Sequence, residues 1–245
     1  MALHVIIPAR YGSSRFPGKP LVDIGGKPMV QRVMERAAGA KGVATVAVAT
    51  DDERIRRAVE AFGGRAIMTP SVLRSGSDRV AAAAAELGLG DEELVINVQG
   101  DQPLLPPQVL EEITLPLQED PGLGMATPVV EITDPAELTD PNHVKVVMNA
   151  NGDALYFSRQ AIPFPREGGP VTTYKHLGIY AFRKSFLDTF AALPSGRLEQ
   201  IEKLEQLRVL EAGYRLRCVV TVHDSPEVDR PDDAVRVARL LEGDQ

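Results

Sequence analysis

The sequence is poor in cysteine, which limits the chemistry it can carry. Its 245 residues include one cysteine, Cys218, so an intramolecular disulfide and a cysteine-based zinc site are both excluded. Cys218 lies in the alternating run from Leu216 to Val222, which favours a buried strand residue over a nucleophile. A reducing compartment, the cytoplasm, is therefore the expected location.

Long apolar runs and an excess of basic residues are also missing. No stretch reaches the roughly 18 apolar residues that a transmembrane helix needs. Pro8 and Arg10 interrupt the short apolar run near the start, which argues against a signal peptide. There are 27 Lys and Arg residues against 34 Asp and Glu, for a net charge of -7. We therefore expect that the protein neither binds nucleic acid nor inserts into a membrane. An anionic substrate would need a local basic pocket.

Two common nucleotide-binding motifs are absent as well. A P-loop has four residues between its Gly and its Gly-Lys, followed by Ser or Thr. Here five residues separate Gly12 from Gly18, and Pro20 follows Lys19. No Gly-x-Gly-x-x-Gly follows a predicted strand, which disfavours a dinucleotide-binding fold.

What is present, over the first 130 residues, is an alternation of continuous apolar runs with segments of helical periodicity. This pattern predicts an α/β fold with a doubly wound, mostly parallel, Rossmann-like sheet. The predicted strands are Leu3–Ala9, Val43–Thr50, Leu94–Val98 and Met125–Ile132. The predicted helices are Met29–Ala38, Asp52–Phe62, Asp78–Leu87 and Pro107–Leu117.

The pattern changes after about residue 130. Two apolar runs flank Asn149-Ala150-Asn151-Gly152, which predicts a β-hairpin. The remaining predicted elements are strands over His176–Phe182 and Leu216–Val222, and helices over Leu198–Leu210 and Ala234–Leu241. We expect one domain, residues 1–245, with a core of about 1–130 and 216–245 and a smaller antiparallel insert of about 131–215.

The first predicted strand leads into a basic loop, Pro8 to Pro20, that carries Arg10, Arg15 and Lys19. In an open α/β sheet, ligands bind beyond the carboxyl ends of the strands. Small residues in the loop let backbone N–H groups approach an anion. The mixture of fixed cations and amides predicts a triphosphate site, and the alternative is a surface loop with three solvated cations.

Two aspartates follow predicted strands. Asp101 comes after the strand that ends at Val98, and Asp229 comes after the strand that ends at Val222. A carboxylate just beyond a central strand points into the ligand crevice, and Mg²⁺ is the hard cation that triphosphate chemistry uses. Each aspartate alone could equally be a turn residue or a helix cap.

Several stretches spread over nearly the whole chain form a recognisable set. In order, they are IIPARYGSSRFPGKPL (6–21), ATDD (49–52), SGSDR (75–79), NVQGDQP (97–103), HLGIYAFR (176–183), LEQIEKLEQLRVL (198–210) and VDRPDD (228–233). Together they resemble one family, the 3-deoxy-manno-octulosonate (Kdo) cytidylyltransferases, also called CMP-Kdo synthetases. The first stretch is shared by many sugar nucleotidyltransferases, whereas HLGIY and the LEQIEKLEQLR segment are more specific. Gln102 stands where the family commonly has Glu, and Ser77-Asp78 where Thr and an acidic residue are common.

The resemblance implies a nucleotidyltransferase that converts CTP and Kdo to CMP-Kdo and pyrophosphate with Mg²⁺, for lipopolysaccharide biosynthesis. It implies that Asp101 and Asp229 hold the metal, and that Arg15 and Lys19 act on the terminal phosphates. Family members are typically dimers, which implies a homodimer built through the insert, where the sugar also binds. The implied nucleotide-binding residues are Ala9, Arg10, Gly12, Ser13, Arg15, Lys19, Ser75, Gly76 and Gln99.

The resemblance also implies a sugar-acid site. Glu199, Glu202 and Gln206 fall at i, i+3 and i+7 of the predicted helix and share one face, which could bind sugar hydroxyls or be a solvated face. Arg79 and Arg159 are the candidates to pair with the sugar carboxylate. The other residues expected to line this pocket are Ser77, Gln99, His176 and Tyr180.

Two other functions remain open. One is a cytidylyltransferase for another acceptor, such as sialic acid or the 8-amino form of Kdo, and the other is a non-catalytic nucleotide-binding module. The predicted helix over 198–210 argues against sialic acid but does not separate Kdo from its 8-amino form. The presence of both basic and acidic candidates in one crevice argues against a sensor. CTP rests on the resemblance, and no general base is identified.

Overall fold

The computed structural model describes residues 2–12, 16–73, 75–169 and 171–243. Its strands are β1 (Leu3–Ala9), β2 (Val43–Thr50), β3 (Arg65–Met68), β4 (Leu94–Asn97), β5 (Met125–Glu131), β6 (Lys145–Met148), β7 (Ala154–Ser158), β8 (Tyr174–His176), β9 (Tyr180–Arg183) and β10 (Arg217–Thr221). Its helices are the 3-10 turn η1 (Lys19–Leu21) and α1 (Met29–Ala38), α2 (Glu53–Ala61), α3 (Gly76–Glu86), α4 (Pro107–Glu119), α5 (Pro135–Thr139), α6 (Lys184–Ala192), α7 (Arg197–Glu202), α8 (Leu207–Glu211) and α9 (Pro231–Gly243).

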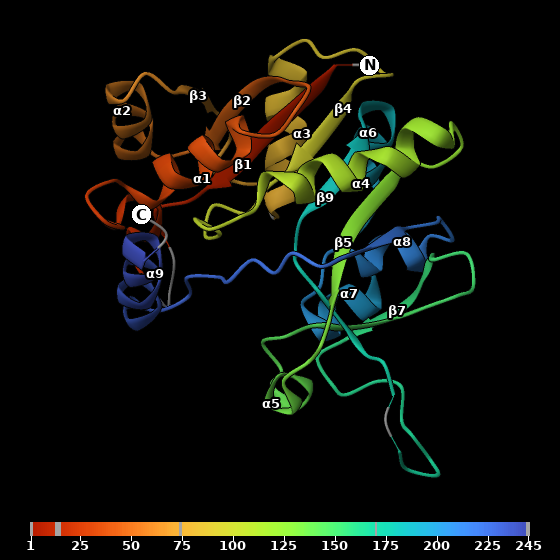
Figure 1. Ribbon diagram of the computed structural model, residues 1–245. Coiled ribbons are helices and arrows are strands. Elements are labelled where there is room, and N and C mark those ends of the chain that lie inside the picture. Colours follow the sequence, from red (N-terminus) through yellow and green to blue (C-terminus); the bar gives the residue numbers. More distant parts are fainter. Residues whose placement is uncertain (1, 13–15, 74, 170, 244–245) are drawn as a thin grey trace.

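The ten strands form one mixed sheet with helices on both faces (Figure 1). The order is β3-β2-β1-β4-β9-β5-β8-β6-β7, and β10 pairs with β5. Strands β3, β2, β1 and β4 are mutually parallel. The predicted doubly wound α/β class, with a parallel core and antiparallel additions, is confirmed.

Strand β1 shows why the sequence folds this way. Val5 and Ile7 pack into one cluster with Val33 of α1, whereas Ile6 packs into a second cluster with Val80 of α3. All three β1 side chains are fully buried. A strand covered on both faces needs a continuous apolar run, and each such side chain contributes about 1.5–3 kcal/mol on burial.

Strand β9 lies between β4 and β5 and runs antiparallel to both. This strand and the following helix α6 come from the segment expected to form a separate insert, yet they belong to the central sheet. Phe182 of β9 and Phe190 of α6 are fully buried, with their rings 5.7 Å apart. The remaining strands of that segment, β6, β7 and β8, extend the same sheet at one edge.

The predicted β-hairpin is confirmed as the pair β6 and β7. Its turn is closed by the Asn149 side chain, which accepts hydrogen bonds from the backbone N–H groups of Asn151 and Asp153 at 2.9 and 3.0 Å. Gly152 has a φ of 80°, a left-handed conformation that glycine adopts without a steric cost.

Two predicted elements are divided in the structure, so the expectation of single elements was wrong. The strand predicted over 176–182 is interrupted at Gly178, where φ is 70°. The helix predicted over 198–210 is broken at Lys203, which is left-handed with a φ of 56°. The break lets Leu204 and Leu207 enter the core, where they are 6% and 0% exposed. Burial of these side chains therefore overrides the local helical preference.

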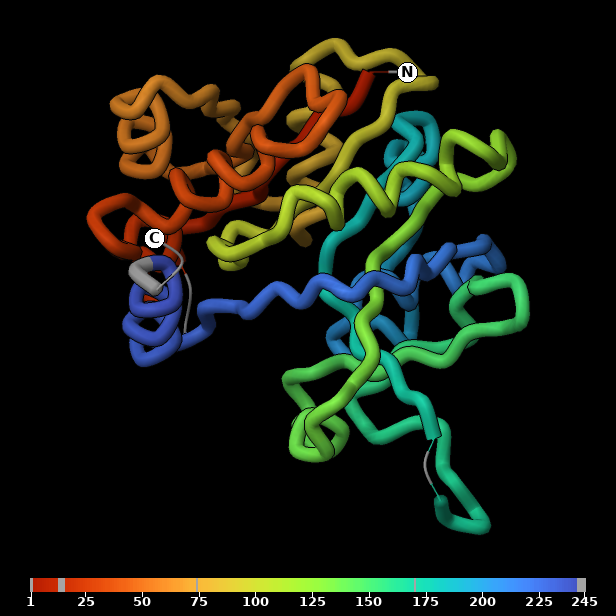
Figure 2. Tube along the Cα trace, in the orientation of Figure 1, coloured from red at the N-terminus to blue at the C-terminus, as the bar shows by residue number. Residues whose placement is uncertain are grey.

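The chain returns to its N-terminal half through an extended segment after β10 (Figure 2). Helix α9 then packs against the loop that precedes α1, where Val228 and Val237 join a small apolar cluster with Ile24 and Met29. This return brings residues 227–229 beside the loop that follows β4. Among the described residues, no helix has the length and apolar character needed to cross a bilayer.

Candidate active site

A cleft of about 620 Å³ opens beyond the carboxyl end of β4. Residues from six separate parts of the chain line it, and this is the edge of the sheet where an open α/β fold binds its ligands. The lining residues are Gln99, Asp101, Asn142, Val144, Arg159, His176, Gly178, Tyr180, Lys203, Leu204, Glu205, Gln206, Glu227 and Asp229.

One end of the cleft is a charged cluster of Lys19, Asp101 and Asp229. The Lys19 Nζ donates hydrogen bonds to Asp101 Oδ2 at 2.6 Å and to Asp229 Oδ1 at 2.9 Å. Burial alone would lower the pKa of Lys19, but the charges and hydrogen bonds of the two carboxylates outweigh it and raise this pKa above its usual value. The ammonium group therefore remains charged. Its charge is balanced by two carboxylates that lie far from it, and from each other, in the sequence.

This cluster fits a magnesium ion. The two carboxylates already converge on one cation, and the buried Asp101 Oδ1 has no hydrogen-bond partner in the described part of the chain. Within residues 2–12, 16–73, 75–169 and 171–243 there is no cage of three or more His, Cys, Asp or Glu side chains. Mg²⁺ is typically held by one or two carboxylates together with substrate phosphates, which is the donor set found here.

The basic loop lies between β1 and η1, next to this cluster. Gly18 has a φ of 73°, and its N–H donates to the Tyr11 carbonyl at 3.0 Å, so the loop closes and starts η1 at Lys19. Arg10 is exposed and donates to the Leu73 carbonyl. Gly12 has open space where a Cβ would stand. Ser13 and Arg15, both predicted to bind the nucleotide, lie outside the described residues.

The N-terminus of α3 forms another part of this end. Ser75 caps the helix by accepting from the Asp78 N–H at 3.1 Å. A Cβ at Gly76 would stand 3.4 Å from the Pro8 Cγ and 4.0 Å from the Gln99 Oε1, so β1, α3 and the loop after β4 meet closely here. A helix N-terminus presents free N–H groups and a partial positive charge, which suits a phosphate.

The other end of the cleft is a chain of neutral hydrogen bonds. The Tyr180 hydroxyl donates to Gln206 Oε1 at 3.0 Å, and the Gln206 amide nitrogen lies 3.5 Å from His176 Nδ1. The Thr127 hydroxyl donates to the Ile179 carbonyl at 2.6 Å and lies 2.8 Å from His176 Nε2. Because that hydroxyl has one proton, already donated, His176 must carry its own proton on Nε2.

The electrostatics of this end agree with that assignment. Burial lowers the pKa of His176 to about 3, so the imidazole is neutral, and part of the ring faces the solvent of the cleft. Burial also raises the pKa of Tyr180 well above its usual value. The rings of Phe157 and Tyr180 lie 5.1 and 5.3 Å from the imidazole. The result is a fixed, uncharged surface of donors and acceptors, as sugar hydroxyls require.

Arg159 lines the cleft and is held in place by Glu202. The Glu202 carboxylate accepts from Ser158 Oγ at 2.9 Å and from the Arg159 N–H at 3.0 Å. The Arg159 guanidinium donates to the carbonyls of Glu202 and Pro141, each at 2.8 Å. Glu202 does not itself line the cleft. It acts on the site through the arginine.

Besides Glu202, three further residues predicted to contact the sugar do not line the cleft. The Glu199 carboxylate pairs with Arg208 at 2.7 Å, behind the cleft, because the helix breaks at Lys203 and the expected shared face with Glu202 and Gln206 does not form. Arg79 is fully buried and pairs with Asp51 at 2.9 Å, which removes it from the cleft. This corrects its expected pairing with the sugar carboxylate.

Ser77 is the third of these residues. It is fully buried and acts through a neighbour, because its hydroxyl donates to Glu205 at 2.8 Å and accepts from the Asn97 amide at 3.0 Å. Gln99, by contrast, lines the cleft as expected, and its amide donates to the Gly178 carbonyl at 3.0 Å.

Sequence reasoning missed four cleft residues with polar side chains: Asn142, Lys203, Glu205 and Glu227. Burial raises the pKa of Glu205, although its two contacts with Ser77 act in the opposite direction. Enclosure of its carboxyl, together with the charges of Asp101 and Asp229, raises the pKa of Glu227 to about 8. Glu227 is nevertheless open to the solvent of the cleft. No local motif marks these residues, since the break at Lys203 and the returning C-terminal segment place them.

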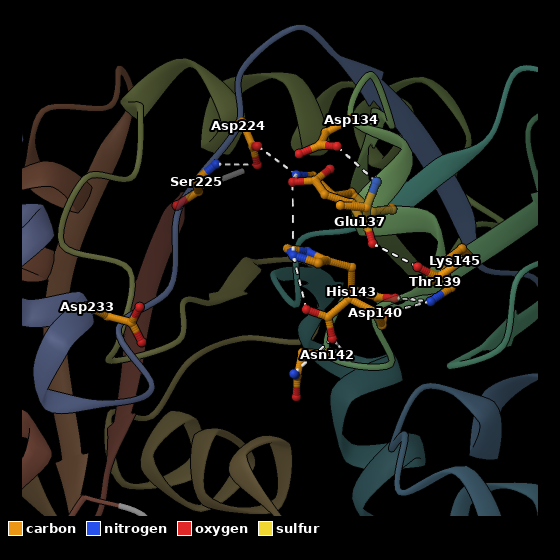
Figure 3. A network of polar contacts seen from close by, with 12 residues as sticks. Asp134, Glu137, Thr139, Asp140, Asn142, His143, Lys145, Asp224, Ser225 and Asp233 are labelled. Carbon is orange, nitrogen blue, oxygen red and sulfur yellow. Dashed lines mark hydrogen bonds and ion pairs between the residues drawn. The ribbon is translucent and has the colours of Figure 1, made fainter.

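A network of polar contacts joins α5 and the loop after it to the segment that follows β10 (Figure 3). The Lys175 ammonium group bridges Glu137 of α5 and Asp224 after β10, at 2.5 and 2.8 Å. The buried Lys145 ammonium donates to the carbonyls of Asp140 and His143 at 2.9 and 2.6 Å. The network ties the loop that carries Asn142 to the segment that leads into Glu227 and Asp229, so both walls are fixed to the same sheet.

Comparison with known proteins decides the family. A family model described as cytidylyltransferase matches residues 4–218. The chain belongs to this cytidylyltransferase family. A 3-deoxy-manno-octulosonate cytidylyltransferase from Desulfatibacillum aliphaticivorans is 57% identical over 242 residues, 98% of this chain and 99% of the relative. The family resemblance predicted from the sequence is confirmed, and so is the nucleotidyltransferase class of the enzyme.

Other cytidylyltransferases are equally similar. An 8-amino-3,8-dideoxy-manno-octulosonate cytidylyltransferase from Shewanella halifaxensis is 57% identical over 234 residues, 95% of this chain and 96% of the relative. A solved structure of a CMP:2-keto-3-deoxy-manno-octonic acid synthetase complexed with CTP superposes with a TM-score of 0.93 at 45% identity and covers all of both chains. The chain is thus a cytidylyltransferase of the Kdo type. Some of its relatives are named for Kdo and others for 8-amino-Kdo.

Proposed function

We propose that this enzyme transfers the cytidylyl group of CTP to a 3-deoxy-octulosonate sugar acid, with release of pyrophosphate. The observation that carries the proposal is one cleft with two chemically different ends. A charged cluster suits a triphosphate, and a neutral hydrogen-bonding surface suits a sugar. The family resemblance favours Kdo as the acceptor and leaves its 8-amino form open, and relatives named for Kdo and for 8-amino-Kdo support this class of sugar acid.

In the proposed reaction, the anomeric hydroxyl oxygen attacks the α-phosphorus of CTP. The new bond joins this oxygen to the phosphorus, the bond to the bridging oxygen of the β-phosphate breaks, and the hydroxyl proton is lost. The contribution of the protein is to position the reactants and to stabilise charge. Lys19 is proposed to bind the terminal phosphates and to stabilise the leaving pyrophosphate.

Asp101 and Asp229 would hold the magnesium ion. A bound Mg²⁺ supplies positive charge that offsets the phosphate oxygens. When CTP enters, Lys19 can exchange one of its two carboxylate partners for a phosphate oxygen, which frees carboxylate oxygens at the cluster. The N-terminus of α3, at Ser75 and Gly76, is proposed to bind phosphate through backbone N–H groups.

The sugar acid is proposed to bind at the end of the cleft that is lined by His176, Tyr180 and Gln206. Arg159 and Lys203 are the positively charged side chains that line the cleft within its described part, and they suit the sugar carboxylate. Gln99, Tyr180, Glu205 and Gln206 offer donors and acceptors to the hydroxyls. Discrimination by such groups is strong because a wrong substrate leaves buried polar atoms without partners.

The proposal is tested by measuring pyrophosphate release with CTP, Mg²⁺ and a sugar acid. We expect release only when all three are present, with sialic acid a poor replacement for Kdo. Its N-acetyl group would leave acceptors unpaired at the neutral end, and two such losses of about 1–3 kcal/mol each amount to roughly a hundredfold. Faster release with sialic acid would overturn the proposed acceptor. Nucleotide binding without any release would favour a sensor.

We also propose a symmetric homodimer built through the segment after residue 130. That segment exposes the apolar side chains of Leu155, Phe164 and Ile201, at 60%, 84% and 64%. The part between β7 and β8 extends away from the rest of the chain (Figure 1). Light scattering at micromolar concentration should give the mass of two chains, and a monomer mass would contradict the proposal.

A further inference from the structure

The 140–143 loop, between α5 and β6, forms one wall of the cleft through Asn142. Its shape is set by hydrogen bonds within the loop (Figure 3). The Asp140 carboxylate accepts from the Asn142 N–H at 2.8 Å and from the Asn142 side-chain amide at 2.9 Å, and the His143 N–H donates to the Asp140 carbonyl at 3.2 Å. Such hydrogen bonds close a turn, but they do not fix where the turn lies relative to the cleft.

Lys145 fixes the position of the 140–143 loop. It is the first residue of β6 and pairs with Ser158 of β7 and with Lys175 of β8, so its backbone is part of the sheet. Its side chain is fully buried, and its ammonium group donates to the carbonyls of Asp140 and His143, one at each end of the loop, at 2.9 and 2.6 Å. Among the described residues, Lys145 forms no ion pair within 4.0 Å. A buried charge is costly without partners, so these two carbonyls hold the loop to the sheet.

The 140–143 loop in turn holds Arg159. The Arg159 guanidinium donates to the Pro141 carbonyl of the loop and to the Glu202 carbonyl, each at 2.8 Å. Both acceptors are neutral, and in the described part of the chain Arg159 forms no ion pair within 4.0 Å, so an anionic ligand can pair with it. Lys145 does not itself line the cleft, whereas Asn142 and Arg159 do. The loop is thus the link through which a buried cation can act on the cleft.

We propose that Lys145 is a positioning residue for the acceptor. By holding the 140–143 loop, it places the Pro141 carbonyl that orients the Arg159 guanidinium toward the carboxylate of the sugar acid, and it keeps Asn142 at the wall of the cleft. The proposal rests on the proposed function, because it assigns the sugar carboxylate to Arg159. Binding groups must be held to within about 0.5 Å, so a change that loosens their support weakens binding without touching the ligand.

The first experiment measures the KM for Kdo by pyrophosphate release at saturating CTP and Mg²⁺, and the Kd for CTP by calorimetry. Lys145→Met removes the ammonium group and keeps most of the apolar side chain. The KM for Kdo should rise by about tenfold or more, because a loosened Arg159 no longer meets the carboxylate in one geometry. The Kd for CTP should not change, because the nucleotide is proposed to bind at the cluster of Lys19, Asp101 and Asp229. The 8-amino acid has the same carboxylate, so its KM should rise by the same factor.

Lys184→Met is the matched control. Lys184 is also a buried lysine, and it pairs with Asp188 at 2.6 Å. It lies in α6, at the opposite end of β4 from the cleft, where its N–H donates to the Glu93 carbonyl at 2.9 Å. The control should lose stability in denaturant unfolding and keep both constants. An unchanged KM for Kdo in Lys145→Met, an equal rise in Lys184→Met, or an equal loss of affinity for CTP in Lys145→Met would leave Lys145 with a structural role alone and overturn the proposal.

A second pair of variants tests the loop itself, even if Lys145→Met does not fold. The Asp140 side chain is 40% exposed, so its truncation leaves no buried cavity. Asp140→Ala removes the acceptor of both Asn142 hydrogen bonds and should raise the KM for Kdo by about fivefold, the effect of roughly one hydrogen bond. Asp140→Asn keeps an accepting oxygen and should restore most of the wild-type value. Equal KM values in these two variants would contradict control of the acceptor by the loop.

The wild-type enzyme separates failure of this proposal from failure of the proposed function. If pyrophosphate release requires a sugar acid but its KM is the same in the wild type, in Lys145→Met and in Asp140→Ala, the role of Lys145 is wrong and cytidylyl transfer stands. If neither Kdo nor its 8-amino form supports release by the wild-type enzyme, the proposed function itself is rejected.

Discussion

The two ends of the cleft are held together by different forces. At the end proposed to bind the triphosphate, called the phosphate end, Lys19 is bound by two opposite charges, and the Asp101 Oδ1 has no partner in the described chain. At the end proposed to bind the sugar acid, called the sugar end, His176, Gln206 and Tyr180 form neutral hydrogen bonds in one consistent direction. A charged cluster can exchange partners when a charged ligand arrives, whereas a neutral network is fixed beforehand.

This difference has a consequence for recognition. The phosphate end must reorganise when the nucleotide binds, so its affinity depends on the charges that the ligand brings. The sugar end is pre-organised, so it discriminates by shape and by hydrogen-bond direction. Changes at the phosphate end should therefore act on the reaction step and on the triphosphate, and changes at the sugar end on the choice of acceptor.

The largest effect is expected for Asp101→Ala. It removes the carboxylate that ties Lys19 to the loop after β4 and is proposed to hold Mg²⁺. Turnover should fall by roughly a thousandfold or more, since charge stabilisation in the transition state contributes several kcal/mol. Thermal unfolding should stay near wild type, as it should for the surface control Asp120→Ala. Full activity in the folded variant would exclude Asp101 as a metal ligand.

A large loss of stability is expected for Glu199→Gln. Its carboxylate pairs with Arg208, and their side chains are 12% and 5% exposed. Removing one charge from a buried pair typically costs about 3–5 kcal/mol. Denaturant unfolding should show this loss, while the ratio of turnover with Kdo to turnover with sialic acid should not change. A normal unfolding curve together with a changed acceptor preference would indicate that Glu199 contacts the sugar acid, as the sequence predicted.

A smaller effect is expected for Lys19→Ala. CTP binding should weaken by about tenfold or more, because a charged contact to the terminal phosphates is lost. CMP lacks those phosphates, so its affinity should change little. Calorimetric titration with both nucleotides measures this, and Lys41→Ala, at a side chain that is 90% exposed, serves as the control. Equal losses of affinity for CTP and for CMP would show that Lys19 does not bind the terminal phosphates.

The smallest effect concerns pH and His176. Its pKa is lowered to about 3 in the folded protein from a usual 6.5. Between these values the unfolded chain binds more protons, so the free energy of unfolding should decrease as pH falls, by less than about 1.4 kcal/mol per unit. His176→Gln should flatten this dependence between pH 6.5 and 4 in denaturant titrations. Identical slopes in the wild type and in His176→Gln would contradict a neutral, buried imidazole.

The sequence predicted the phosphate end better than the sugar end, for a physical reason. Asp101 follows a strand within a few residues, and Lys19 lies in the loop after the first strand, so topology alone brings them to one edge of the sheet. Asp229 differs, because it lies well beyond the end of β10 at Thr221 and is placed by the return of the C-terminal segment. Local patterns therefore determine where Asp101 and Lys19 lie, although their pairing is visible only in the structure.

The sugar end depends on contacts between distant segments. Residues 198–210 have a helical pattern, but Lys203 is left-handed because Leu204 and Leu207 enter the core, and this turns Glu205 toward the cleft. Glu227 is placed by the return of the C-terminal segment and the burial of Val228. Single-sequence patterns carry no signal for such tertiary constraints.

The position of β9 has a consequence for how the chain folds during synthesis. Residues 94–97 form β4 early, but the antiparallel partner that covers their free edge is residues 180–183. Until those residues leave the ribosome, the edge of an apolar strand remains open to pairing with other chains. Closing it requires contact between segments far apart in sequence, which slows folding. We expect nascent chains that end before residue 180 to bind chaperones or to aggregate, and longer chains to be protected.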